Sequence, residues 1–166
     1  LGCAGGDGQA HSAGAIGDPE FVPWLIKQME VPELARVAGE AFSFITGVDI
    51  AYEDLEGEPP EGFEAGPTDE PEDEDVGMDP DEDLPWPDSE RIEKWWTEHR
   101  STFSRGTRYF LGQPITEQVL QQGLREGYQR QRAAAALELA LGQPDRPLFE
   151  VRAPGFRQLQ RLCEDT

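Results

Sequence analysis

The stretch GDPEFVPWLIKQMEVPELARVAGEAFSFITG, residues 17–47, decides the fold of this chain. In its first half, Asp18 suits a helix N-cap and Pro19 suits the first helical position. The apolar residues that follow recur at helical spacing: Phe21, Val22, Leu25, Ile26 and Met29. This half therefore predicts one short amphipathic helix.

The second half of the stretch predicts a second helix, antiparallel to the first. Val31-Pro32 ends the first helix and begins the second, and Gly47 is expected to end the second helix as a left-handed C-cap. The apolar face of this helix comprises Leu34, Ala38, Ala41, Phe42 and Ile45. The glycine-rich opening before Asp18 is either the end of a preceding helical unit or a frayed terminus.

A similar pattern returns in PITEQVLQQGLREGYQRQRAAAALELALGQP, residues 114–144. Thr116 is the expected N-cap, Ile115 can staple onto Leu120, and Gly127 marks the turn. The following helix is expected to end after Leu141, where Gly142 and Pro144 follow. Aligned from Arg36 and Arg132, the two second helices place Ala134, Leu137 and Leu141 in the positions of Ala38, Ala41 and Ile45.

Several of these segments carry a family resemblance. GAIGDPEFVPWLIKQM, residues 14–29, looks like a HEAT repeat of the type also found in phycobilin lyases. With it, DEDLPWPD, the Trp95-Trp96 pair, GTRYFLGQPI, GYQRQRAAAALELAL and LFEVRAPGFRQ resemble the C-terminal part of a bacterial family of uncharacterised HEAT-repeat proteins. The resemblance implies an α-solenoid preceded by further repeats, and it implies little chemistry.

A long acidic insertion separates the two helix pairs. Arg36 and Arg132 are 96 residues apart, whereas solenoids of this kind repeat every 35 to 45 residues or so. The net charge of −20 is concentrated between the pairs: residues 49–90 hold nineteen acidic and no basic side chains, against a net −4 before them and +3 after them. We therefore expect a helix pair at 1–48, an irregular insertion at 49–90 and a helical region at 91–166.

The insertion has too little apolar surface to offset the entropy of ordering it, and it holds seven prolines. We expect an extended loop whose end, around Leu84 and Trp86, docks on the helices. One interpretation is recognition of a basic protein, with Glu72, Asp73, Glu74, Asp75 and Trp86 as partner-binding residues. The alternatives are a shield over the arginines of the last 76 residues and a solubilising loop without a partner.

Calcium is a second hypothesis for the same segment. Asp79, Asp81, Asp83 and Glu90 occupy positions one, three, five and twelve of an EF-hand-like loop, and a hard cation prefers carboxylate oxygens at that spacing. Position six, however, is Leu84 where the sharp turn needs glycine, and the neighbouring prolines favour an extended path. The pattern therefore favours a solvated acidic run over a calcium site, and we expect no other cofactor.

The region after the insertion predicts further helices. Asp88 can cap a helix with a broad apolar face that comprises Ile92, Trp95, Trp96, His99 and Phe103, a spacing more typical of a core than of a ligand site. TRYFL and PLFEV, residues 107–111 and 147–151, are expected to pair as two short strands, and APGFRQLQRL ends the chain as a short helix. The predicted class is all-α with one small β element.

Composition excludes several functions. Nucleic-acid binding needs clustered Lys or Arg, and this chain is strongly acidic. Arg125, Arg132 and the other late arginines are expected to pair with helix ends, to pack through their stems or to contact the acidic loop. No apolar run approaches the roughly 18 residues of a membrane helix. Cys3 and Cys163 show no metal or redox spacing and favour thiols in a reducing, cytoplasmic compartment. The start at Leu1, without a signal-peptide pattern, indicates a piece of a longer protein.

Two function classes remain. The sequence favours a non-enzymatic protein-binding module, a scaffold or adaptor for another protein, since no phosphate loop, nucleophile elbow or zinc spacing is present and His11 and His99 lack a catalytic partner pattern. The opposing class is a lyase-like or tetrapyrrole-handling protein, which the resemblance alone suggests. A deep pocket with an ionisable group would favour the enzyme, and a solid core around Trp95 and Trp96 would favour the binding module.

Overall fold

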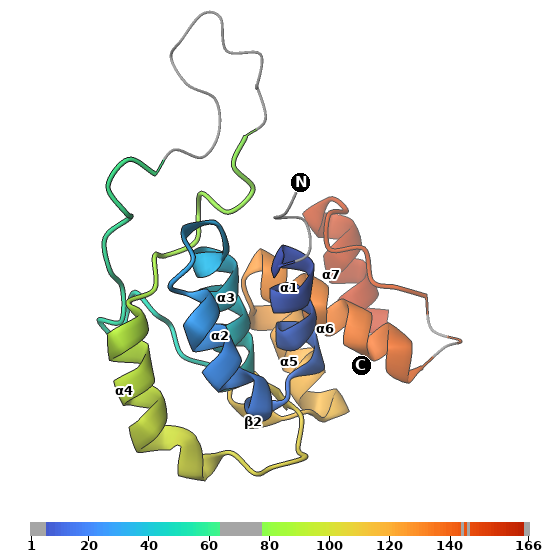
Figure 1. Ribbon diagram of the computed structural model, residues 1–166. Coiled ribbons are helices and arrows are strands. Elements are labelled where there is room, and N and C mark those ends of the chain that lie inside the picture. Colours follow the sequence, from blue (N-terminus) through green and yellow to red (C-terminus); the bar gives the residue numbers. More distant parts are fainter. Residues whose placement is uncertain (1–5, 64–77, 144, 146, 165–166) are drawn as a thin grey trace, which may run out of the picture. The chain divides into compact units, whose positions relative to one another are not determined.

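The computed structural model (Figure 1) describes residues 6–63, 78–143, 145 and 147–164. Two compact units divide the chain, an N-terminal unit of residues 1–112 and a C-terminal unit of residues 113–166. The described part is mostly helical and includes one small antiparallel sheet, as the sequence predicts. No described helix is both long enough and apolar enough to cross a membrane.

The N-terminal unit is organised around one long helix, α3. Its helices are α1 (Gly6–Ile16), α2 (Val22–Gln28) after a 3₁₀ turn at Pro19–Phe21, α3 (Pro32–Thr46), and α4 (Ser89–His99) with a 3₁₀ turn at Arg100–Thr102. Helix α3 packs against α1 and α2, and α2 also contacts α4 (Figure 1). Helix α4, which follows the acidic insertion, therefore belongs to the same body as the first three helices.

The helix ends in this unit follow the predicted capping. The Asp18 carboxylate accepts a hydrogen bond from the Glu20 amide at 2.9 Å, and Gly47 ends α3 with φ of 76°. Asp88 caps α4 by accepting from the Glu90 and Arg91 amides. Local side-chain chemistry thus sets these boundaries, as the sequence indicates.

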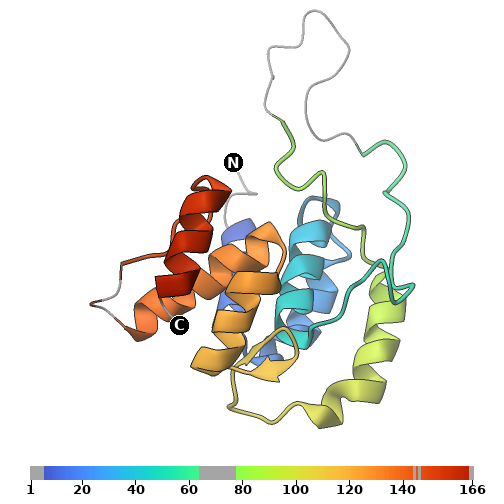
Figure 2. The same cartoon turned by 180° about the vertical axis from the view of Figure 1, so that it is seen from behind.

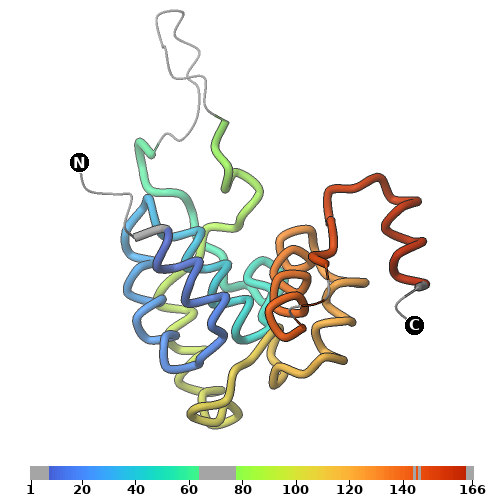
Figure 3. The backbone as a smooth tube through the Cα atoms, turned by 90° about the vertical axis from the view of Figure 1, so that its right-hand side faces the viewer, coloured from blue at the N-terminus to red at the C-terminus, as the bar shows by residue number. Residues whose placement is uncertain are grey.

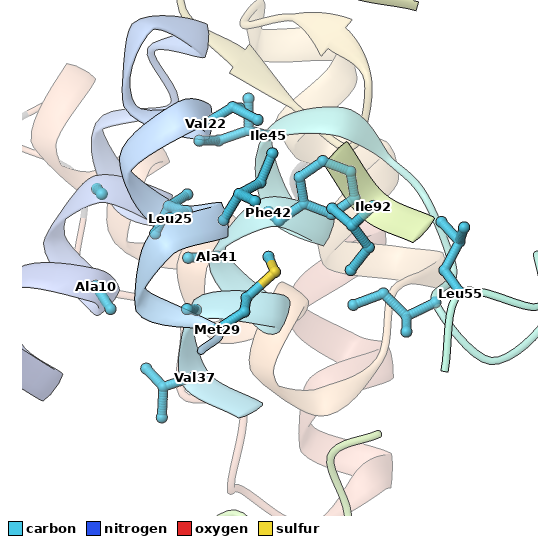
Figure 4. Packing of buried hydrophobic residues seen from close by; sticks show 14 of the residues in the cluster. Ala10, Val22, Leu25, Met29, Val37, Ala41, Phe42, Ile45, Leu55 and Ile92 are labelled. Atoms are coloured by element: carbon cyan, nitrogen blue, oxygen red, sulfur yellow. The ribbon is translucent and has the colours of Figure 1, made fainter. Parts of the chain in front are cut away.

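The core of the N-terminal unit lies between α2, α3 and α4. Phe42 and Ile45 of α3, Leu25 of α2 and Ile92 of α4 are fully buried, and Figure 4 shows them pointing toward one another. Leu55 joins this cluster from the beginning of the insertion. Burial of such side chains stabilises a fold by about 1.5–3 kcal/mol each relative to exposure.

Residues 6–16 of the glycine-rich opening form a helix, as the alternative of a preceding helical unit expects, and residues 1–5 lie outside the described residues. Helix α1 buries Ala10 and Ala13 against α3. The two helices approach closely because Gly14 has no side chain: a Cβ there would lie 3.0 Å from the Ala41 Cα. The sequence lacks large apolar residues in this segment, and the close crossing of small residues replaces them.

Substitution of Gly14 tests this crossing. We expect Gly14→Ala to lower the free energy of unfolding by about 1–3 kcal/mol, since the added methyl group meets the backbone of α3. Gly8→Ala is the matched control in the same helix, because a Cβ at Gly8 meets nothing within 4 Å. Equal unfolding free energies for the two variants in urea titrations would contradict the crossing.

The described part of the C-terminal unit contains three helices, α5 (Glu117–Glu126), α6 (Gln129–Gly142) and α7 (Gly155–Glu164). Figures 2 and 3 show α5 and α6 running beside each other. The Thr116 hydroxyl accepts from the Val119 amide, as the predicted N-cap requires. Gln158 of α7 accepts a hydrogen bond from the Arg132 guanidinium at 2.6 Å, which attaches α7 to α6.

The buried face of α6 differs from the one that the internal repeat predicts. Ala135, Ala136 and Leu139 are buried, whereas Leu137 and Leu141 are 47% and 67% exposed. The alignment of Arg36 with Arg132 therefore places the large residues on the wrong side. The alanines of this helix lie on nearly all of its sides, so its apolar pattern defines no single face. Packing against α5 selects the side that is buried.

A pair of leucine substitutions checks the orientation of α6. We expect Leu139→Ala to destabilise the protein by about 2–5 kcal/mol, because it leaves a cavity in a packed site. Leu137→Ala changes an exposed side chain two residues away and should stay within about 0.5 kcal/mol of the wild type. Thermal unfolding followed by circular dichroism measures both, and a larger loss for Leu137→Ala would favour the predicted face instead.

The small sheet pairs different segments from those expected. Strand β1 (Tyr109–Phe110) pairs with β2 (Gln113–Pro114), and residues 147–151 form no strand. The connecting residues Leu111 and Gly112 both have positive φ, 49° and 77°, as in the turns that join hairpin strands across two residues. Local turn geometry thus takes precedence over the distant pairing of TRYFL with PLFEV.

Candidate functional site

The two ends of the acidic insertion are joined to each other close to the core. Glu56 and Pro87 form an antiparallel bridge, the Gly57 amide donates to the Trp86 carbonyl at 2.8 Å, and the Asp88 amide donates to the Leu55 carbonyl at 2.8 Å. We call this paired segment, residues 55–57 and 86–88, the stem. It closes the insertion into a loop whose two ends start from one place on the N-terminal unit.

Arg91 of α4 reinforces the stem. Its Nη1 donates to the carbonyl oxygens of Asp54 and Glu56, both at 3.1 Å, and its Nε pairs with the Asp88 carboxylate at 3.1 Å. One side chain therefore links the first turn of α4 to both sides of the stem. The pair is partly exposed, so its electrostatic contribution is small and its role is mainly geometric.

Beyond the stem, Arg36 of α3 is held by both arms of the insertion. Its Nη2 pairs with the Asp79 carboxylate at 2.6 Å, and its Nη1 donates to the Asp81 carbonyl at 2.9 Å. The guanidinium carbon lies 4.9 Å from the centre of the Trp86 ring and 5.7 Å from that of Phe63. We call Arg36, Phe63, Asp79, Asp81 and Trp86 the clamp.

The aromatic residues of the clamp also contact each other. The Phe63 and Trp86 rings meet edge to face with centroids 4.9 Å apart, one from each arm of the insertion. One turn along α3 from Arg36, Gly39 leaves room for Pro87 of the stem, since a Cβ there would lie 3.3 Å from the proline ring. Arg36 and Gly39 thus present one face of α3 to the insertion.

The clamp contains an ion pair that is almost removed from water. The side chains of Arg36 and Asp79 are 11% and 10% exposed. Charges at this depth are costly unless they are paired and hydrogen-bonded, and here the carbonyl and the two aromatic faces complete the surroundings of the guanidinium. Removing either partner takes from the other its opposite charge at a depth where the remaining hydrogen bonds compensate only in part.

Two of the four predicted calcium ligands, Asp79 and Asp81, lie in the clamp, and the other two lie outside it. Asp79 pairs with Arg36 and also accepts the Asp81 amide at 2.9 Å, while Asp83 and Glu90 are exposed, the latter in the first turn of α4. Within the described ranges, no three His, Cys, Asp or Glu side chains gather into a group that could hold a metal ion. Calcium binding stays a prediction.

The predicted partner-binding residues divide into two groups. Glu72, Asp73, Glu74 and Asp75 lie outside the described residues. Trp86 is described, and it belongs to the clamp, so the predicted docking of the insertion end on the helices is confirmed. Trp86 is partly buried against Arg36 and Phe63.

The aromatic face of α4 packs into the core as expected. Trp95 meets Phe42 edge to face at 5.6 Å and stacks on His99 at 4.2 Å, and Trp96 contacts Phe103 at 5.3 Å. The His99 Nδ1 lies 2.7 Å from the Trp95 carbonyl oxygen. These side chains are part of the packing around Phe42 and Ile92.

Two late arginines bind helix ends in the C-terminal unit. Arg132 donates to the Leu124 carbonyl at 2.8 Å, near the end of α5, and Arg125 donates to the Leu162 carbonyl at 3.3 Å, near the end of α7. This confirms the expected helix-end role for these two side chains. Cys163 is an exposed free thiol, whereas Cys3 lies outside the described residues.

Sequence reasoning missed three residues of this region. Arg36 was used only to align the repeats, and Phe63 and Arg91 were not singled out. A signal was present, because Phe63 and Trp86 are aromatic residues on the two sides of an otherwise acidic and proline-rich run. Such a pair at the ends of a run that cannot fold by itself predicts attachment points.

Comparison with known proteins adds no family to this picture. No protein-family model, curated protein sequence or solved structure matches the chain.

A substitution at Asp79 tests the clamp. We expect Asp79→Asn to leave the helices intact and to raise the amide hydrogen-exchange rates of Gly57 and Asp88 about tenfold or more, which corresponds to about 1.4 kcal/mol. Asp83→Asn removes an exposed carboxylate four residues away and is the matched control. If both variants exchange at the wild-type rate, the ion pair does not hold the insertion.

Proposed function

We propose that this chain is a non-enzymatic protein-binding module of the HEAT type, and that its partner is a basic protein. The observation that carries the proposal is the clamp, which fixes both arms of a segment with nineteen carboxylates against α3. A solubilising loop without a partner needs no such attachment. A recognition element does, because a charged segment contributes to specificity when its origin on the surface is fixed.

The charge distribution supports a basic partner. Residues 49–90 have no basic side chain of their own, and the described carboxylates beside the clamp point into solvent, since Glu58, Glu61, Glu82 and Asp83 are exposed. A concentrated field of one sign accelerates encounter with a partner of the opposite sign. This attraction weakens as salt shortens the range of the interaction.

The helical architecture supports a binding module rather than an enzyme. Helices α2 and α3 form one packed pair, and α5 and α6 form another, which is the building unit of HEAT-type arrays. Trp95 and Trp96 are partly buried and pack against the buried cluster around Phe42. This is the arrangement that favours the binding module over a tetrapyrrole-handling protein.

A charge-matched pair of variants tests the proposal. In the first, the seven carboxylates between residues 64 and 77 become amides. In the second, the same change is made at seven exposed carboxylates elsewhere: Glu30, Glu33, Glu93, Glu98, Glu117, Glu126 and Asp145. Both variants then have the same net charge, and they differ in where the charge is lost.

The partner is first captured from source-cell extract with the wild-type chain and identified by mass spectrometry. Its affinity for each purified variant is then measured by calorimetry at low and moderate salt. We expect the insertion variant to lose about tenfold or more in affinity at low salt, and the control about twofold or less. Equal losses would show that net charge alone matters, and no loss in either would refute the acidic recognition element.

A further inference from the structure

The guanidinium of Arg36 is surrounded by groups that all belong to the insertion. The Asp79 carboxylate and the Asp81 carbonyl accept its N–H groups, and the Phe63 and Trp86 rings lie against it. Helix α3 supplies the arginine and the insertion supplies the receptor. The receptor spans both arms of the loop, from Phe63 to Trp86, and the stem brings the arms together.

We propose that Phe63, Asp79, Asp81 and Trp86 form an arginine-binding site in which Arg36 is an internal ligand, and that an arginine of the basic partner exchanges with it. This inference rests on the proposed function and specifies the chemistry of the partner. The Arg36 guanidinium seated among these groups is the observation that points to the ligand class. The geometry of this site favours arginine over lysine.

A guanidinium fits these four groups better than an ammonium does. It is planar, so it can donate in its plane to a carboxylate and a carbonyl and still stack its faces on aromatic rings. A lysine ammonium is a compact, strongly hydrated charge that loses more hydration in a site of this depth. The Asp79 side chain is 10% exposed, so the desolvation difference between the two cations counts fully here.

A partner arginine displaces Arg36 only above a threshold concentration, because Arg36 is part of the same chain. An intramolecular ligand competes at an effective concentration in the millimolar range, so a dilute single arginine does not displace it. The carboxylates of the insertion raise the local concentration of a basic partner and bring several arginines to the site. Exchange would also replace the contacts of Arg36 while the stem still joins the two arms, so partner binding and loop attachment are coupled.

Two basic peptides of equal length and charge test the site, one rich in arginine and one rich in lysine. The variant Arg36→Ala removes the internal ligand from the arginine-binding site. We expect this variant to bind the arginine peptide about tenfold more tightly than the lysine peptide, with a smaller ratio in the wild type. Adding Trp86→Ala should bring the ratio to about one. An Arg36→Ala variant without preference for arginine would overturn the inference.

A measurement on the wild-type chain avoids any folding defect of the variants. The arginine peptide should shift the NMR signals of the Arg36 guanidinium and accelerate its proton exchange with water, because Arg36 leaves the site. The lysine peptide at the same occupancy should leave both unchanged. Unchanged Arg36 signals with a saturating arginine peptide would overturn the exchange.

These outcomes are separable from those of the proposed function. If partner affinity depends on the carboxylates of residues 64–77 but peptide binding shows no arginine preference, the arginine site is refuted and the acidic recognition element is retained. If arginine preference is found but the partner ignores those carboxylates, the recognition element is refuted and the arginine site is retained.

Discussion

The packing of α3 is the constraint on which the N-terminal unit depends. This helix contacts α1 across a glycine, α2 across the main apolar cluster, and the insertion through Arg36 and Gly39. Three sides of one helix are thus occupied by three different kinds of contact: small residues, large apolar residues and a buried charge. A long acidic insertion is accommodated because its ends are attached to a helix that is already fixed.

The clamp shows how a segment without a core of its own can have defined ends. The insertion has too few apolar residues to offset the entropy of ordering it. At its ends, a few strong contacts suffice: a buried ion pair, two aromatic rings and a backbone bridge. Buried ion pairs contribute little net stability compared with apolar packing, but they specify one arrangement, because each charge accepts few alternative partners.

The same contacts connect structure and function. The proposed recognition of a basic partner and the proposed seating of its arginine in the clamp would use the same chemistry at two ranges. Diffuse attraction acts over about a Debye length, roughly 8 Å at physiological salt, and the clamp acts at hydrogen-bond distance. On these two proposals, the protein would attract basic partners broadly and then distinguish them by arginine content.

The sequence by itself determined the helices whose ends carry specific capping residues, such as Asp18, Gly47 and Thr116, and the position of the acidic insertion. These features depend on local chemistry between residues a few positions apart. Only the tertiary structure decided which face of the alanine-rich α6 is buried, that α1 packs through Gly14, and that Arg36 meets Asp79 and Trp86. These contacts join residues that are distant in the sequence, and they depend on how the elements pack in space, which no local pattern encodes.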